Sequence, residues 1–248
     1  SFLKNPNFSS FVLKGNESGG FVGDESAFVL ASHLIKKSNK PFYIRGGIGV
    51  HTASGCFAAG ASGVVLDDQL LALKSSSFPF HWKSLLKNLA VENTKTIMVN
   101  NKKIRVVNHP LFKDAKKIGW GNPSEFMWPL GQVVGMSEAI ANKYKTVGRY
   151  IQAIHSQITI NINAAQKNQP LGVHSKMAKS IGTQFPIIQG PMTRVSDVPE
   201  FIESVANAGG LPFLALAMTS GKNVSELLKN TKSKLKDKPW GVGVLGFV

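Results

Sequence analysis

The stretch Phe42-Tyr43-Ile44-Arg45-Gly46-Gly47-Ile48-Gly49 joins a short apolar run to a glycine-rich turn, and its surroundings repeat that arrangement. Residues 11–13 form an apolar strand candidate before it, and residues 63–66 form another after it. The intervening ranges 26–37 and 52–59 have helical spacing of apolar or small residues. Strand, helix and strand at this spacing indicate βαβ units, and unbroken apolar strands are typical of a parallel sheet buried on both faces.

The same pattern returns near the end of the chain, from Pro186 onward. Residues 186–189, 211–217 and 240–248 are strand candidates, and helices are predicted over 198–208 and 224–235. The strands therefore come in two groups of three, one at each end of the chain. A closed (β/α)8 barrel needs eight parallel strands, so these six do not close one, and we expect an α/β fold.

A basic segment separates the two groups and has a different pattern. Residues 74–180 contain 16 basic and 4 acidic residues, which accounts for most of the net charge of +15. A helix is predicted over 81–89, a β-hairpin around Asn100 and Asn101, and mostly helix over 131–165. We therefore expect an α+β insert over residues 76–180, flanked by domains at 1–75 and 181–248.

The excess of positive charge raises the question of nucleic-acid binding. Only 4 of the 29 basic residues are Arg. Proteins that read DNA in its grooves rely on Arg for bidentate contacts to bases, so the composition disfavours a nucleic-acid-binding protein. A lysine-rich solvated surface is the simpler interpretation, with docking to an acidic partner domain as the second. The single Cys56 excludes an internal disulfide and a multi-cysteine metal site, and the six His residues form no metal-ligand pattern, so we expect no metal.

No apolar run approaches the roughly 18 residues that a membrane span requires, and no signal peptide is visible at Ser1. A cytoplasmic protein is the default expectation. The chain does not begin with Met, which favours a processed or truncated chain.

Two glycine pairs are candidate binding elements. Gly46 and Gly47 end a predicted strand, where glycine lets the backbone approach a phosphate; a tight turn without a ligand is the alternative. Gly19 and Gly20 follow the first strand, where they would permit close contact with a planar ring; a flexible loop is the alternative.

These motifs carry a resemblance to a known family. Residues 14–20, 46–49 and 59–67 resemble the second half of the nitronate monooxygenase-like flavin barrels, and residues 186–192, 207–211 and 239–243 resemble the first half. The amino-acid sequence of residues 190–197 is similar to that of flavin barrels found in tandem in large polyketide or polyunsaturated fatty-acid synthases. The resemblance implies three late strands of one FMN-binding (β/α)8 TIM barrel, the basic insert, and three early strands of a second one. The chain is then a fragment spanning two modules.

Because the family binds FMN, the resemblance implies FMN as cofactor, with NADPH as a candidate reductant. It places the phosphate-binding ends at Gly46, Gly47 and Asp67, and the loop near the flavin ring at Gly19 and Gly20. In the second half, the segment beside the ring is formed by Gln189, Gly190, Pro191 and Met192. The implied function is flavin-dependent oxidoreduction of an acyl or small-molecule substrate, of the enoyl-reductase type, with neighbouring synthase domains as partners.

The sequence departs from the family at positions that carry chemistry. Phe21 occupies the position of the His that acts as base in nitronate-oxidising members, and Phe cannot take a proton, so the catalytic residues stay unknown. Asp67 and Asp68 stand where a Gly-Thr-like pair often helps to hold the phosphate, and two carboxylates repel an anion. The alternative is a degenerate, non-catalytic scaffold or docking module of such a synthase. In either case we expect the fragment itself to be inactive.

Overall fold

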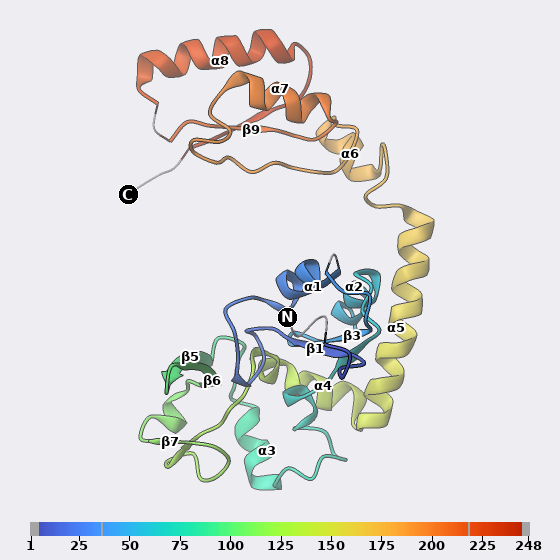
Figure 1. The fold of residues 1–248 in the computed structure, drawn as a ribbon, viewed down its shortest axis with the longest axis vertical. Helices are drawn as coiled ribbons and strands as arrows, with labels where there is room; N and C mark the ends of the chain where they lie inside the picture. Colours follow the sequence, from blue (N-terminus) through green and yellow to red (C-terminus); the bar gives the residue numbers. More distant parts are fainter. Residues whose placement is uncertain (1–4, 36, 218, 245–248) are drawn as a thin grey trace. The chain divides into compact units, whose positions relative to one another are not determined.

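The computed structural model describes residues 5–35, 37–217 and 219–244 and contains two compact units, Ser1–Asn163 and Ala164–Val248 (Figure 1). Each unit has its own apolar core. The contacts place residues 76–163 in unit 1 together with residues 1–75, so most of the basic segment folds onto the first group of strands.

Unit 1 is built on a three-stranded parallel sheet in the order β1-β3-β4, as the βαβ pattern predicts. The strands are β1 Phe11–Lys14, β3 Phe42–Arg45 and β4 Gly63–Val65, and the crossovers carry α1 Ala27–Ile35 and α2 Thr52–Ala58. Lys14 pairs with Arg45, and Arg45 pairs with Val65, so the carboxyl ends of all three strands lie together at one edge.

The basic segment completes the core of this sheet. Its helices α4 Ser137–Tyr144 and α5 Val147–Asn168 contribute Ile140, Tyr150 and Ile154, which are buried with Ala31, Ile44 and Ala53 from the βαβ units. Small residues on α1 and α2 let these helices approach closely, which explains why their sequences are rich in alanine.

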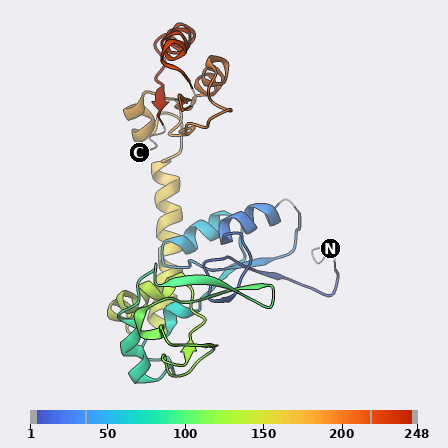
Figure 2. The same cartoon turned by 90° about the vertical axis from the view of Figure 1, so that its left-hand side faces the viewer.

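The predicted hairpin is present as β5 Thr94–Val99 and β6 Lys102–Val107. Its turn is the two-residue type, because Asn100 and Asn101 both have positive φ, 48° and 58°. The hairpin is the long green pair of strands in Figure 2. The sequence did not indicate its outer neighbour: the short strand β2, Gly20–Phe21, pairs antiparallel with β6, so the Gly19-Gly20 loop is partly strand.

A second core of unit 1 is aromatic. Trp128 is fully buried and lies 5.1–5.7 Å, between ring centroids, from a set of neighbouring rings: Phe78, Trp82, Phe112 and Trp120. Its indole Nε1 donates a hydrogen bond of 2.8 Å to the Gly121 carbonyl. The elements around this core are short: α3 Phe80–Leu86, β7 Lys117–Ile118, β8 Phe126–Met127 and the 3-10 helices η2 Asp68–Leu70, η3 Pro110–Phe112 and η4 Gln132–Met136.

Unit 2 contains α6 Lys176–Ile181, α7 Pro199–Asn207, β9 Phe213–Ala215, α8 Gly221–Leu235 and β10 Gly241–Gly243. The strands β9 and β10 are parallel, and Ile202, Leu214 and Leu235 form the core. The strand predicted over 186–189 is reduced to a single parallel bridge between Ile188 and Leu211. Of the strand predicted over 240–248, residues 241–243 form β10. Residues 245–248 lie outside the described residues. The helix α6 was not expected.

Two searches of the described residues bear on function. No helix in them is both long and apolar enough to cross a membrane. In the same ranges, no three or more His, Cys, Asp or Glu side chains are grouped so that they could hold a metal ion.

Candidate functional site

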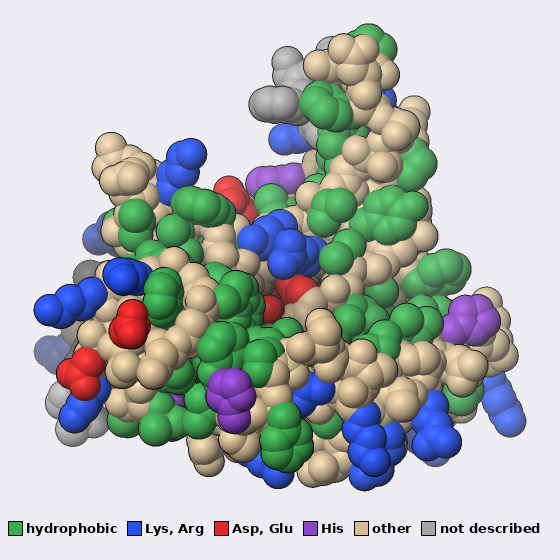
Figure 3. All heavy atoms as spheres, turned by 90° about the horizontal axis from the view of Figure 1, so that it is seen from below, with side chains coloured by type: hydrophobic (Ala, Val, Ile, Leu, Met, Phe, Trp, Pro, Cys, Tyr) green, Lys and Arg blue, Asp and Glu red, His purple; other side chains and the backbone are tan. Residues whose placement is uncertain are grey.

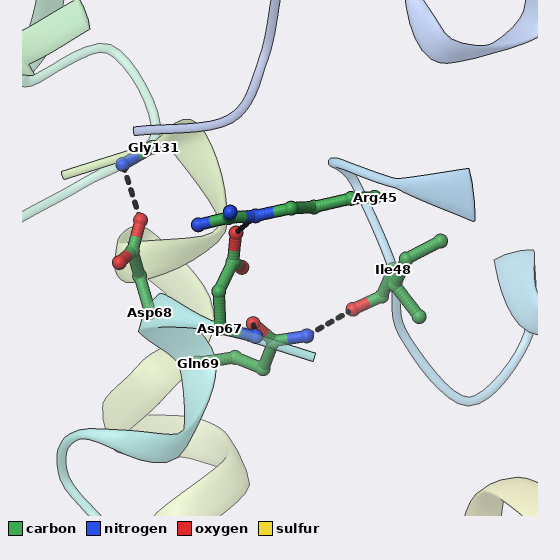
Figure 4. Close-up of polar contacts among 6 residues, drawn as sticks. All are labelled: Arg45, Ile48, Asp67, Asp68, Gln69 and Gly131. Atoms are coloured by element: carbon green, nitrogen blue, oxygen red, sulfur yellow. Dashed lines mark hydrogen bonds and ion pairs between the residues drawn. The ribbon is translucent and has the colours of Figure 1, made fainter. Parts of the chain in front are cut away.

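Charged side chains gather where the three strands of unit 1 end. Lys14 ends β1, Arg45 ends β3, and Asp67 and Asp68 follow β4. The Arg45 Nε donates to Asp67 Oδ2 at 2.8 Å, which forms a partly buried ion pair (Figure 4). Burial and the adjacent Arg45 lower the pKa of Lys14, against the opposing effect of the two carboxylates. The edge that the resemblance assigns to a phosphate therefore holds two cations and two carboxylates.

Asp68 is the most perturbed group of this cluster. Its side chain is almost fully buried, and its Oδ2 accepts a 2.5 Å hydrogen bond from the Gly131 N–H. Burial and the neighbouring Asp67 raise the pKa of Asp68 to about 7, although the Gly131 bond, Arg45 and Lys14 act in the opposite direction. The carboxyl group is thus held by the backbone of the basic segment and changes its charge near neutral pH.

Gln69 links the ends of two strands. It is fully buried, its Nε2 donates to the Ile48 carbonyl at 3.0 Å, and its Oε1 accepts from the Asp67 N–H at 2.9 Å (Figure 4). The backbone N–H at the end of β4 is therefore bonded within the chain. Sequence reasoning did not single out Gln69; the available signal was a Gln directly after a charged pair at a strand end.

The Gly46-Gly47 turn is explained by packing within the chain. Both residues have left-handed φ, 113° and 66°, which favours glycine. A Cβ on Gly46 would lie 2.7 Å from Ser18 Oγ and 3.1 Å from Glu17 Cγ. The Glu17 carboxylate in turn accepts from the Ala27 N–H at 3.1 Å, at the start of α1. The Glu17 side chain therefore packs against the Gly46-Gly47 turn and also holds the first residue of α1.

The Gly19-Gly20 loop is covered by the basic segment. A Cβ on Gly19 would lie 2.2 Å from the Pro129 carbonyl oxygen and 2.7 Å from the Gly131 nitrogen. A Cβ on Gly131 would reciprocally lie 2.6 Å from the Glu17 carbonyl oxygen. Gly20 has φ 74° and pairs with Arg105 in β6. The close approach that glycine permits at position 19 is used by the protein's own backbone.

The charges at the strand ends of unit 1 are unfavourable for an FMN phosphate. The N–H groups of Asp67 and Gly131 are satisfied by Gln69 and Asp68, and the Arg45 Nε is taken by Asp67. Two carboxylates lie at this edge, and at short range they repel an anion.

In unit 2, the predicted site residues lie at the carboxyl ends of adjacent strands. Gln189 uses its side chain locally: Oε1 accepts from the Phe213 N–H of β9 at 3.0 Å, and Nε2 donates to the Gly190 carbonyl. A Cβ on Gly243, at the end of β10, would lie 2.2 Å from Pro191 Cβ, so Pro191 and β10 are in close contact. Parallel α/β sheets bind ligands at this edge.

Gly190 and Met192 frame an open position at that edge. No atom lies within 4 Å of the Cβ that Gly190 lacks, and Met192 is 45% exposed. The following turn is rigid, because the fully buried Ser196 accepts from the Met192 N–H through Oγ at 2.8 Å and donates its own N–H to the Met192 carbonyl at 2.8 Å. Unlike Gly19, Gly190 has room beside it for a ligand.

The structure thus divides the predicted site residues between its units. Gly19, Gly20, Gly46, Gly47 and Asp67 lie in unit 1, whereas Gln189, Gly190, Pro191 and Met192 lie in unit 2. Phe21, at the position of the family's His, is 59% exposed, and the Lys102 Nζ lies 5.8 Å from its ring centroid.

Comparisons with known proteins give one family match and several similar folds. The family model for nitronate monooxygenase matches residues 174–246, within unit 2. FabK from Thermotoga maritima is structurally similar at 19% sequence identity and a TM-score of 0.55, over 64% of this chain and 57% of FabK. Its M276A mutant gives 20% identity and 0.54, over 64% and 55%. A search of curated protein sequences finds no significant match.

The likeness to FabK shows an α/β fold, and it spans little more than half of the FabK chain. The nitronate monooxygenase model matches less than a third of this chain, all of it in unit 2, and the likeness to FabK shows the fold alone.

Proposed function

We propose that this chain is part of an FMN-dependent oxidoreductase and that unit 2 supplies the strand end that faces the flavin ring. The observation that carries the proposal is the coincidence of the family match, residues 174–246, with the open carboxyl edge at Gly190. FMN bound there would supply hydride transfer. Gln189 would hold the strand end in register with β9, and Gly190 would leave space for a flat ring.

More specifically, we propose that the whole protein contains an enoyl-reductase-type module of a multidomain polyketide or fatty-acid synthase. Its substrate is then an acyl group, its reductant NADPH, and its partners are neighbouring domains. In unit 1, Phe21 cannot act as the base that nitronate oxidation uses, which argues against that reaction in the first module. For the module that contains unit 2, hydride transfer is proposed because it does not need that base.

Replacing Gly190 with valine tests the flavin position. No atom of the protein lies within 4 Å of the added Cβ and Gly190 is exposed, so folding should be unchanged, but the valine would occupy the space assigned to the ring. We expect FMN affinity of a synthase module containing residues 181–248 to fall by about tenfold or more, equivalent to about 1.4 kcal/mol. The measurement is quenching of flavin fluorescence on titration.

The matched control is Gly221→Val, at an equally open position at the start of α8. It should leave FMN affinity unchanged. A wild-type module that takes up no FMN, or a Gly190→Val variant that binds FMN normally, would overturn the proposal.

A second role is favoured for unit 1 by the carboxylates at its strand ends. Because Asp67 and Asp68 are bonded within the fold and place two carboxylates at the strand ends, we propose that unit 1 is a non-catalytic scaffold for a neighbouring domain. A synthase containing both barrels should then carry one FMN per polypeptide, as measured by flavin absorbance after denaturation. Two FMN per polypeptide would contradict this role.

A further inference from the structure

A separate cavity lies in the basic segment of unit 1, between α3 and α4, and it has a volume of about 340 Å³. Figure 3 looks onto the side of the molecule that carries α3, and Lys and Arg side chains are spread over this side with several Asp and Glu among them. The chemically important lining residues of the cavity are Lys74, Phe80, Lys83, Lys87, Glu138 and Lys145. None of them belongs to the strand-end site.

The walls of this cavity are tied together before any ligand arrives. The Lys83 Nζ donates to the Leu73 and Ser76 carbonyl oxygens, each at 2.8 Å, so its positive charge is fixed at the wall. The Lys74 N–H donates to the Lys145 carbonyl at 3.0 Å, which joins the loop before α3 to the end of α4. A preformed pocket loses little conformational freedom on binding.

The charge of the cavity is unbalanced. In the ranges that the structure describes, the side-chain ammonium groups of Lys74, Lys87 and Lys145 form no ion pair and no hydrogen bond. Glu138 is the single acidic residue that lines the same space. These three exposed ammonium groups line a small, half-open cavity and a fourth is held at its wall, so the site attracts an anion.

An exposed aromatic ring lies at the same place. Phe80 begins α3 and is 89% exposed, although the other large aromatic side chains nearby, such as Phe78 and Trp82, pack into the Trp128 core. A large apolar side chain left in water beside a charged cavity is a typical partner for a flat or apolar part of a ligand.

We propose that this cavity binds a phosphorylated small molecule with an aromatic body, of the class of nucleoside diphosphates. The lysines would contact the phosphates and Phe80 would stack on the base. The volume of this half-open cavity lies in the range of small-ligand pockets, about 300–1,000 Å³, which favours a small molecule over the surface of an acidic protein domain.

Titration of the full chain with ADP, with inorganic pyrophosphate and with adenosine tests the site, by calorimetry at low salt. We expect ADP to bind more tightly than either fragment. The double variant Lys74→Gln/Lys87→Gln should weaken ADP and pyrophosphate by about tenfold or more. Phe80→Ala should weaken ADP severalfold and leave pyrophosphate unchanged. These side chains are exposed and make no hydrogen bond that holds the cavity, so folding should be preserved.

The matched control is Lys113→Gln/Lys116→Gln, which removes the same charge from exposed positions of unit 1 outside the cavity. It should leave ADP affinity unchanged. Equal weakening by both double variants would show attraction to net charge alone and would overturn the proposal. The proposal would also be overturned if the wild-type chain bound neither ADP nor pyrophosphate. That result would stand against it even if the same lysines were found to bind an acidic protein domain.

Discussion

Replacing Gly19 with alanine is expected to destabilise unit 1 by about 3 kcal/mol or more. The added methyl group would lie 2.2 Å from the Pro129 carbonyl oxygen and 2.7 Å from the Gly131 nitrogen, and both are backbone atoms that no rotamer change can move. Relief requires the segment around Gly131 to separate from the loop, which also breaks the Gly131–Asp68 hydrogen bond. Urea unfolding followed by tryptophan fluorescence measures the loss.

Gly148→Ala provides the control for this substitution. Gly148 lies in α5, no atom is within 4 Å of its missing Cβ, and alanine favours a helix over glycine by about 0.5–1 kcal/mol. This variant should be as stable as the wild type or slightly more stable. If Gly19→Ala instead kept wild-type stability and lost only flavin binding, the glycine would serve a ligand and not the backbone contact.

Replacing Asp68 with asparagine is expected to stabilise the protein at pH 8 by about 2–4 kcal/mol and to flatten its pH dependence. The pKa of Asp68 is raised to about 7 in the folded protein, above its ordinary value of 3.8. Between these values the folded state binds more protons than the unfolded state, so stability falls as the pH rises from about 4 to 7. Asparagine carries no charge and keeps an oxygen that can accept from the Gly131 N–H.

Thermal or urea unfolding at several pH values between 4 and 8 measures this effect. Asp114→Asn is the control, because Asp114 is an exposed carboxylate of the same unit, and its replacement should leave the pH slope unchanged. A stability of the Asp68→Asn protein that still falls between pH 4 and pH 7 as steeply as the wild type would refute the assignment.

The sequence predicted the local part of this fold well. Apolar strands that end in glycine turns at β3, and helices that begin after them, follow from interactions between residues close in the chain. The parallel order β1-β3-β4 follows from the same βαβ pattern. The hairpin β5-β6 was predicted because Asn100 and Asn101 tolerate the positive φ of its turn.

The parts that could not be predicted depend on partners far apart in the chain. A glycine needed for close approach looks the same in a sequence whether the approaching group is a phosphate, a ring or another segment of backbone. Gly19 meets Gly131, more than a hundred residues later, and no local pattern indicates that contact. The sequence shows that Asp68 carries a charge that would repel a phosphate. Its burial and its hydrogen bond with Gly131 depend on the fold and cannot be read from the sequence.

The aromatic core of unit 1 has an optical consequence. Three of the four Trp residues, Trp82, Trp120 and Trp128, lie there, and Trp128 is 5.3 Å from Trp82 and 5.7 Å from Trp120 between ring centroids. Indole rings this close couple their electronic transitions and give a split circular dichroism band that vanishes when the rings separate. Trp240 belongs to unit 2. Unit 1 therefore has a spectroscopic signature of its own, by which its melting can be followed separately from the loss of helix in the whole chain.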